Sequence, residues 1–304
     1  MCLQDDGRAL TTAAQKHAQR NRGTLFVEDG EVITTEAYPG DQFTMRIRVP
    51  QCAATAKPGS FVHIVCGDAL PMRRPLSIMR VGNDSIEVLY KIVGEGLHLL
   101  AGKRPGDTIS VLGPIGEPFK PSAERPNCLL IGGGVGIPPI VFLGETLQSD
   151  RWNPVAILGS EIPFPFELER SGILTPWLDD DMSSTMPLLE SWGIPTRLTS
   201  LSDFDGCYRG YVTDLAEKWL QSLDDGKRAE TEIFACGPTP MLKAVAALAT
   251  KYDLPCQVSL EEFMACAVGG CAGCTVEIRT DSGPAMKRVC VDGPVFDAAT
   301  VVWK

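Results

Sequence analysis

The chain has 304 residues, of which 44% are hydrophobic and 22% are charged, a composition typical of a folded globular protein and not of a disordered or fibrous one. This length predicts two or three domains. The formal net charge of −10, without any block of Lys and Arg residues, argues against nucleic-acid binding.

The first residues do not have the pattern of a secretory signal. Residues 1–23 include Asp5 and Asp6 and lack the apolar core of a secretory signal, so we interpret them as an N-terminal extension. No run approaches about 18 consecutive apolar residues, which predicts no transmembrane helix. We therefore expect a cytoplasmic protein that does not bind a membrane.

Residues 24–125 are predicted to form a small antiparallel β-barrel. Short alternating or β-branched runs recur in this region, and Gly and Pro separate them at Pro39-Gly40, Pro58-Gly59 and Pro105-Gly106. Several short strands at this spacing, without a long helical pattern between them, are typical of a barrel. The runs are residues 31–38, 43–49, 61–66, 85–91 and 108–112.

Residues 126–255 are predicted to form an α/β domain. Strand-like runs at 128–131, 155–158, 195–198 and 232–236 alternate with helix-like segments. Such alternation builds βαβ units and a parallel sheet. Residues 256–304 form a third part, too short for a large core, in which a bound metal would supply stability.

A cysteine motif in this third part is the strongest functional signal. Cys266, Cys271 and Cys274 have the C-x4-C-x2-C spacing of a plant-type [2Fe–2S] centre, and Cys290 can supply the fourth thiolate. A structural zinc site is the alternative, but it usually shows two short-spaced pairs. The other seven of the eleven cysteines are scattered, as small buried residues often are.

Two segments of the predicted barrel are candidates for binding a dinucleotide. An Arg-Pro-Leu-Ser segment between strands offers a guanidinium to a pyrophosphate and a hydroxyl to a flavin edge. A second segment offers Tyr90 for stacking and glycines, including Gly96, for close approach to phosphate. Alone, either segment could be a simple turn. The residues concerned are Arg74, Pro75, Leu76, Ser77, Leu89, Tyr90, Lys91, Gly96 and Leu97.

A glycine-rich turn opens the α/β domain directly after its first strand. Backbone N–H groups of this turn could cradle a diphosphate at a helix N-terminus. Ile137 replaces the third glycine of the usual dinucleotide fingerprint, so a merely tight turn is the alternative. The second candidate ends a later strand, where a buried structural Cys is the alternative. The residues are Gly132, Gly133, Gly134, Val135 and Gly136 in the turn, and Cys236, Gly237 and Pro238 after the later strand.

No side chain is predicted to act as a catalytic acid, base or nucleophile. His17, His63 and His98 lack the spacing of a metal site or a triad. Hydride and electron transfer need no such group because the cofactors carry the chemistry. NAD is favoured over NADP because no basic pair follows the strand 155–158, where Glu161 could accept a ribose hydroxyl.

The order of these motifs resembles the ferredoxin–NADP reductase superfamily over residues 24–255. The segment Ser259–Cys266, together with Cys290–Phe296, is more specific and resembles the electron-transfer subunit of dihydroorotate dehydrogenase. This resemblance implies an FAD-binding barrel, a nicotinamide domain and a small [2Fe–2S] domain. It also implies an oxidoreductase that passes electrons between NAD and a separate FMN-containing catalytic subunit in pyrimidine biosynthesis, as a heterotetramer.

The chain departs from that family's pattern at two positions. Leu97 stands where Thr is usual, which removes one hydroxyl from the FAD phosphate site, and Phe263 stands where a basic residue is common. A reductase subunit of the same architecture that serves a hydrogenase, a transhydrogenase or an oxygenase is therefore an alternative. A second alternative is a binding module that a structural zinc ion stabilises and that has no redox activity.

Overall fold

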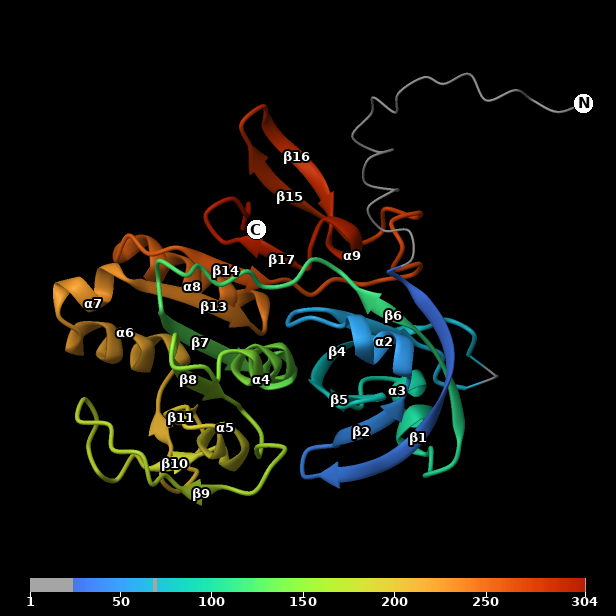
Figure 1. The fold of residues 1–304 in the computed structure, drawn as a ribbon, viewed down its shortest axis with the longest axis horizontal. Coiled ribbons are helices and arrows are strands. Elements are labelled where there is room, and N and C mark those ends of the chain that lie inside the picture. The colour runs from blue at the N-terminus through green and yellow to red at the C-terminus, as the bar shows by residue number, and fades with distance from the viewer. Residues whose placement is uncertain (1–23, 68–69, 304) are drawn as a thin grey trace, which may run out of the picture.

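The structure is a computed structural model that describes residues 24–67 and 70–303, so the expected N-terminal extension lies outside the described residues. A blue-to-teal barrel lies beside a sheet with helices, and the red C-terminal part runs along one side of both (Figure 1). Within the described residues, no helix is long and apolar enough to cross a membrane.

The first body is the predicted antiparallel barrel. Its six strands close in the order β1-β2-β5-β4-β3-β6 around a buried apolar core that includes Met45, Ile78 and Val88. Two short helices, α2 (Pro50–Thr55) and α3 (Glu95–Ala101), accompany them. The strands are β1 (Phe26–Tyr38), β2 (Gln42–Arg48), β3 (Phe61–Ile64), β4 (Arg74–Val81), β5 (Ser85–Lys91) and β6 (Thr108–Ile115).

The Arg-Pro-Leu-Ser segment is not a connection between strands, as the sequence suggested, but the first half of β4. Its residues pair with β3, so that Pro75 lies opposite His63. Pairing with β5 begins only at Ile78. Pro75 therefore sits where one side of the strand has no ladder partner, the situation in which a strand tolerates proline.

The second body is the predicted α/β domain, built on a seven-stranded sheet in the order β12-β11-β8-β7-β13-β14-β17. Six strands run parallel and β17 pairs with β14 antiparallel. The strands are β7 (Asn127–Gly133), β8 (Asn153–Gly159), β11 (Thr196–Ser200), β12 (Tyr208–Arg209), β13 (Thr231–Cys236), β14 (Cys256–Ser259) and β17 (Val295–Asp297). The sheet thus extends past residue 255, the expected boundary.

Helices cover both faces of this sheet. On β7, Leu129 and Ile131 face one way and join α6 and α8 in a core, whereas Cys128 and Leu130 face the other way and join α4. This alternation is the two-residue period of a strand. Helix α4 packs against β4 of the barrel (Figure 1). The helices are α4 (Ile137–Thr146), α5 (Pro187–Ser191), α6 (Val212–Ser222), α7 (Asp225–Ala229) and α8 (Thr239–Lys251).

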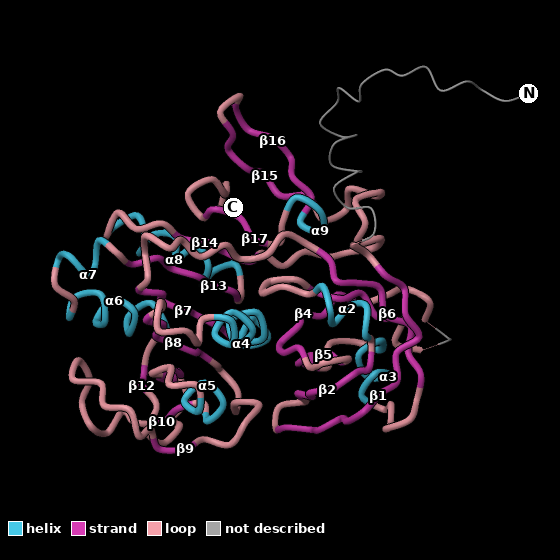
Figure 2. Tube along the Cα trace, in the orientation of Figure 1, coloured by secondary structure: helices cyan, strands magenta, loops and turns pink. Residues whose placement is uncertain are grey.

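The C-terminal part consists of a loop, a hairpin and a short helix. The segment between β14 and β15 is loop throughout (Figure 2). The hairpin β15 (Thr275–Thr280) and β16 (Gly283–Arg288) projects from the molecule, and α9 (Val289–Asp292) leads into β17 (Figure 1). The strands β14, before the loop, and β17, after α9, both belong to the large sheet. The C-terminal part is therefore attached to the sheet at both of its ends.

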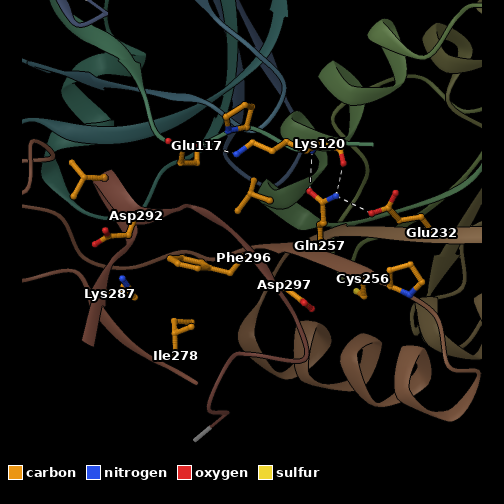
Figure 3. Close-up of a pocket in the computed structure, with 14 residues that line it drawn as sticks. Glu117, Lys120, Glu232, Cys256, Gln257, Ile278, Lys287, Asp292, Phe296 and Asp297 are labelled. Carbon is orange, nitrogen blue, oxygen red and sulfur yellow. Dashed lines mark hydrogen bonds and ion pairs between the residues drawn. The ribbon is translucent and has the colours of Figure 1, made fainter. Parts of the chain in front are cut away.

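Gln257 of β14 ties the linker after the barrel to the sheet (Figure 3). Its side chain accepts from the backbone N–H of Lys120 at 2.9 Å and donates to the Lys120 carbonyl and to Glu232, both at 2.8 Å. Farther along the same seam, the backbone N–H of Glu117 donates to the Gly293 carbonyl at 2.6 Å. These contacts border a cavity of about 570 Å³ and join all three parts of the chain.

Candidate functional site

The four predicted cysteine ligands come together in the C-terminal part, but in two different settings. Cys266 and Cys271 lie on the loop after β14, where Cys271 is exposed. Cys274 and Cys290 are 2% and 1% exposed and belong to the core on one face of the large sheet. All four are free thiols.

The backbone of the loop winds around the sulfur atoms of Cys266, which is partly exposed, and of Cys271, which is exposed. The N–H of Cys271 donates to the Cys266 sulfur, and the N–H of Gly273 donates to the Cys271 sulfur, both at 3.4 Å. Ala267 and Ala272 adopt left-handed backbone conformations, with φ of 55° and 54°. At a residue with a side chain this conformation costs about 1 to 2 kcal/mol, so the fold of the loop must impose it on both alanines.

Arg288 fastens this loop to the helix that carries the fourth cysteine. Its guanidinium donates to the Gly269 carbonyl at 2.9 Å and lies 3.4 Å from the carboxylate of Asp292, which also caps the Arg288 N–H at 2.8 Å. The loop with three ligands and helix α9 with Cys290 are therefore held together by one ion pair and its hydrogen bonds.

The pKa values of Cys266 and Cys290 are shifted in opposite directions. Burial alone would raise the pKa of Cys266, but N–H groups at Val268 and Cys271 and the Cys271 thiol hold it at about 7. Burial and then the neighbouring Cys274 thiol raise the pKa of Cys290 to about 12. Two thiolates for each of two irons is what a [2Fe–2S] centre requires, so these residues fit the cluster. Within the described residues, no three metal-binding side chains converge on one ion.

A cavity of about 1030 Å³ extends from the cluster loop to the barrel. Residues from every part of the chain line it, including Arg74, Ser77 and Lys91 of the barrel, Val135 of the glycine turn, and Gly273 of the cluster loop. Ligand sites commonly have this size and lie between domains. The structure therefore brings most of the predicted barrel residues and the cluster loop to one space.

The two predicted barrel segments meet at the wall of this cavity. A side-chain carbon added at Gly96 would lie 3.1 Å from the Arg74 guanidinium, so Gly96 lies directly beside that side chain. Arg74 donates to the carbonyls of Met72 and Arg73 and forms no ion pair within the described residues. An unneutralised guanidinium in a large cavity fits the pyrophosphate of a dinucleotide.

Tyr90 lines the cavity, and its ring belongs to the barrel core. Tyr90 is 1% exposed, and its ring stacks on Phe43 with centroids 5.8 Å apart in the barrel core. The tyrosine side chain thus packs against Phe43 in the barrel core. Leu97 is 6% exposed and also belongs to this core.

The glycine turn and the Cys-Gly-Pro segment lie side by side because β7 and β13 are neighbours, with Gly132 opposite Cys236. A side-chain carbon at Gly136 would lie 2.4 Å from the Cys236 backbone, and one at Gly133 would lie 2.5 Å from the Met241 sulfur. Gly134 has a φ of 53° and faces open space. Burial raises the pKa of the Cys236 thiol, which is therefore neutral near pH 7.

Several residues that line the cavity were not singled out in the sequence. Three of them, Thr239, Leu260 and Glu261, follow the carboxyl ends of β13 and β14, where ligands bind in open α/β sheets. This placement could have identified them as candidate site residues, but β14 was not predicted as a strand of the sheet. The residues are Phe61, Thr239, Leu260, Glu261 and Pro294.

The barrel, the parallel sheet and the cysteine loop define a flavin- and iron–sulfur-dependent oxidoreductase of the ferredoxin-reductase type. Residues 261–302 match the family described as the iron–sulfur cluster binding domain of dihydroorotate dehydrogenase B. A protein of Desulforamulus reducens, named dihydroorotate dehydrogenase B (NAD(+)), electron transfer subunit, is 30% identical over 91% of this chain and 99% of its own length. A protein of the same name from Geobacillus kaustophilus is 34% identical over 92% of this chain and 98% of its own length.

The chain belongs to the family of dihydroorotate dehydrogenase B electron transfer subunits. Among solved structures, an NADH-dependent reduced ferredoxin-NADP oxidoreductase is 27% identical, with a TM-score of 0.72 over 91% of this chain and 90% of that one. A ferredoxin reductase of carbazole 1,9a-dioxygenase, 22% identical with a TM-score of 0.57 over 76% and 67% of the two chains, shares the fold. The predicted fold class and family are both confirmed.

Proposed function

We propose that this chain carries electrons between a dihydroorotate dehydrogenase catalytic subunit that contains FMN and NAD, by way of a [2Fe–2S] cluster and FAD. One observation carries the proposal: a single cavity is lined by the Arg74–Ser77 segment, the glycine turn and the cluster loop. Cofactors held at these three places would lie close enough to exchange electrons. FAD supplies the conversion between one-electron and two-electron transfer when it is bound.

Cys266, Cys271, Cys274 and Cys290 hold the cluster in this proposal, with Cys266 and Cys271 on one iron and Cys274 and Cys290 on the other. The N–H groups aimed at the Cys266 and Cys271 sulfurs favour negative charge there. Hydrogen bonds to cluster sulfurs raise the reduction potential of such centres. The exposed pair would then mark the side where electrons enter or leave.

FAD binds to the barrel in this proposal, and NAD to the sheet. Arg74 pairs with the FAD pyrophosphate, the hydroxyl of Ser77 faces the flavin edge, and Leu89–Lys91 with Gly96 and Leu97 complete the site. The glycine turn 132–136 and the Cys236–Pro238 segment receive the nicotinamide nucleotide. Glu161, exposed after β8, favours NAD because its carboxylate would repel a 2′-phosphate.

We propose that residues 24–125 bind FAD, residues 126–255 bind NAD and residues 256–304 bind the cluster. Residues 256–304 also contribute β14 and β17 to the sheet of the NAD-binding part. The catalytic subunit docks at the exposed cysteines. Phe263 is 94% exposed and Val268 is 48% exposed, so this surface offers apolar area for a partner. The complete enzyme is a cytoplasmic heterotetramer in this proposal.

The test uses the anaerobically purified chain with and without a catalytic subunit. Alone, the chain should contain FAD and a [2Fe–2S] signal, reduce an artificial electron acceptor with NADH, and leave dihydroorotate unoxidised. Addition of the catalytic subunit should produce dihydroorotate-dependent NAD+ reduction. Turnover of dihydroorotate by the isolated chain would overturn the proposal.

A second candidate is a reductase subunit of the same architecture with another redox partner. Two observations favour this candidate. The chain is 27% identical to an NADH-dependent reduced ferredoxin-NADP oxidoreductase, and the similarity covers 91% of the chain. Phe263 also stands where a basic residue is common in the dihydroorotate dehydrogenase family. Failure to bind any dihydroorotate dehydrogenase catalytic subunit, with NADH-dependent reduction of the chain's own cofactors intact, would support this candidate.

A further inference from the structure

A set of contacts outside every motif described above joins the barrel directly to the α/β domain. Arg80, near the end of β4, donates to the carboxylate of Glu145 in α4 at 3.2 and 3.4 Å. The same guanidinium lies over the ring of Trp192, which follows α5, at 5.5 Å from the ring centroid. One barrel side chain therefore makes both an ion pair and a cation–π contact with the other domain.

A second contact between the two domains lies at the turn between β1 and β2. Gln42 is 2% exposed, and its amide N–H group donates to the carbonyl of Pro163, in the loop after β8, at 2.7 Å. Ile162 of the same loop packs on Gly40, where an added side-chain carbon would lie 2.9 Å from the Ile162 side chain. The barrel thus holds the α/β domain at two separate places.

The contacts of Gln42 and Arg80 fix an orientation of the two domains. Apolar side chains such as Met79 of β4 and Phe142 of α4 also pack between the domains, but apolar burial has no preferred direction. An ion pair and hydrogen bonds specify distances and angles between defined atoms. Arg80 and Glu145 are 38% and 23% exposed, and pairs of this kind contribute little to folding stability. Their main effect is therefore on orientation.

The Arg80–Glu145 pair joins the two elements that carry proposed cofactor segments. Strand β4 begins with the Arg74–Ser77 segment for FAD, and α4 begins directly after the glycine turn for NAD. From Gly136 to Glu145 the helix extends about 14 Å, so a tilt of about 5° moves one end by roughly 1 Å relative to the other. A misplacement of about 1 Å between reacting atoms can cost on the order of a hundredfold in rate.

We propose that Gln42, Arg80 and Glu145 form an interdomain clasp that positions the nicotinamide against the flavin for hydride transfer. The step is NADH + FAD → NAD⁺ + FADH⁻, in which a hydrogen moves with its electron pair. The clasp residues exchange no proton or electron and act only on the distance and angle between the two rings. The proposal rests on the function proposed above, since it needs FAD on the barrel and NAD at the glycine turn.

The experiment compares two half-reactions of the anaerobic chain, loaded with FAD and cluster, in Arg80→Ala. At saturating NADH, the rate of FAD reduction should fall by about tenfold or more. The NADH concentration at half-saturation should stay near the wild-type value, because the glycine turn is intact. The long-wavelength charge-transfer absorbance between reduced FAD and NAD⁺ should weaken, because it requires overlap of the two rings. Electron exchange between FAD and the cluster should keep its wild-type rate, because the Glu117–Gly293 hydrogen bond still joins the barrel to the cluster part.

Arg48→Ala is the matched control, because Arg48 forms ion pairs with Glu31 and Asp84 that lie within the barrel. It should leave the rate of FAD reduction and the charge-transfer absorbance unchanged. Arg80→Lys, which keeps the charge, should restore part of both. Glu145→Ala combined with Arg80→Ala should be no slower than Arg80→Ala alone, because both changes remove the same pair.

Gln42→Met tests the second contact, because it keeps the length of the side chain and removes the donor. It should slow FAD reduction further when combined with Arg80→Ala, since the two contacts are separate. An unchanged reduction rate and charge-transfer absorbance in Arg80→Ala would overturn the clasp. Equal slowing of both half-reactions, or the same losses in Arg48→Ala, would also overturn it, because a general loosening of the fold would explain them. A wild-type chain that binds no FAD or that NADH cannot reduce would overturn the proposed function, and the clasp with it.

Discussion

The two barrel segments proposed to bind FAD and the loop proposed to bind the cluster are organised in opposite ways. Arg74–Ser77 and Leu89–Lys91 stand on strands whose inward side chains, such as Leu76 and Tyr90, are 7% and 1% exposed. No helix or strand holds the loop between Ser259 and Thr275. The barrel therefore shapes its site through apolar packing, whereas hydrogen bonds from Arg288 and from backbone N–H groups hold the loop.

The cluster site itself repeats this contrast on a smaller scale. Cys274 and Cys290 are packed into the core beside the sheet, and the N–H of Val289 donates to the Cys274 carbonyl at 2.9 Å. Cys266 and Cys271 lie on the loop, where Arg288 and backbone N–H groups are the main contacts. One pair is thus positioned by the fold before any iron binds, and the other is held more loosely.

The largest expected effect is the loss of the cluster in cysteine variants. In Cys271→Ser, a hydroxyl replaces a soft thiolate ligand, so the [2Fe–2S] electron paramagnetic resonance signal should disappear while FAD stays bound. Because Cys271 is exposed, the melting temperature of the iron-free protein should not change. Loss of FAD together with the cluster would contradict the separation of the two sites.

Cys290→Ser sharpens the same comparison. It should also abolish the cluster signal, but burial of a hydroxyl at a position that is 1% exposed should lower the stability of the iron-free protein by about 1 to 3 kcal/mol. The unfolding free energies of the two iron-free variants measure the difference. Equal stabilities would show that Cys290 is not positioned by the core.

The second effect concerns the glycine turn, which resembles the barrel in being shaped by packing. In Gly136→Ala, the new methyl group would meet backbone atoms of Cys236 and Gly237 at 2.4 to 2.5 Å, so the two turns must separate. We expect a loss of about 3 kcal/mol or more in stability, as in severe overpacking, and loss of NADH binding. Denaturant unfolding and NADH titration measure the two effects.

Gly134→Ala is the matched control because open space surrounds Gly134. The only cost there is the left-handed backbone, about 1 to 2 kcal/mol for a residue with a side chain. A destabilisation as large as that of Gly136→Ala would mean that backbone strain, and not the contact with Cys236, decides the behaviour of the turn.

The sequence predicted features whose signals are local. Strand alternation identified the barrel and the parallel sheet, and cysteine spacing identified four candidate ligands, which the structure brings together in two pairs. It did not predict that β14 and β17 belong to the sheet, because both strands are short and β17 is contributed by the chain beyond the cluster. The burial of the Tyr90 ring could not be predicted from the local sequence either, because its stacking on Phe43 is a contact between neighbouring strands.

The third effect is on FAD binding by Arg74→Ala. Loss of one charge-assisted contact to the pyrophosphate should cost about 1.5 to 3 kcal/mol, or roughly tenfold or more in FAD affinity. The ratio of flavin to cluster absorbance after dialysis measures the occupancy. The cluster signal should remain, since Arg74 lies in the barrel. Full FAD occupancy in this variant would refute the assignment.

Arg73→Ala is not a suitable control for the Arg74→Ala experiment. Its guanidinium donates to the carbonyls of His63 and Ser110 at 2.9 Å and to the Ser110 hydroxyl at 2.8 Å, so it joins β3 to β6. Arg73→Ala should therefore weaken the barrel as a whole. Arg104→Ala, at an exposed position next to the same barrel, is the suitable control and should retain FAD.

The smallest expected effect is a pH dependence confined to the barrel. His63 is 1% exposed, and neither ring nitrogen has a hydrogen-bond partner in the described part of the chain. Burial and then the nearby Arg73 lower the pKa of His63 from 6.5 to about 4. Between these values the unfolded chain binds the proton and the folded chain does not, so acidification favours unfolding.

The stabilising contribution of neutral His63 is accordingly complete above pH 6.5 and falls as the pH drops toward 4. We expect His63→Leu to reduce the stability lost between about pH 7.5 and about pH 5 by about 1 to 2 kcal/mol. His98→Leu, at an exposed position, should show the wild-type slope. Iron removal should leave this slope unchanged, because the barrel owes its order to apolar packing and not to the cluster. If iron removal changed this pH dependence of stability, the barrel and the cluster loop would unfold as one unit. The bound cluster would then also stabilise the barrel.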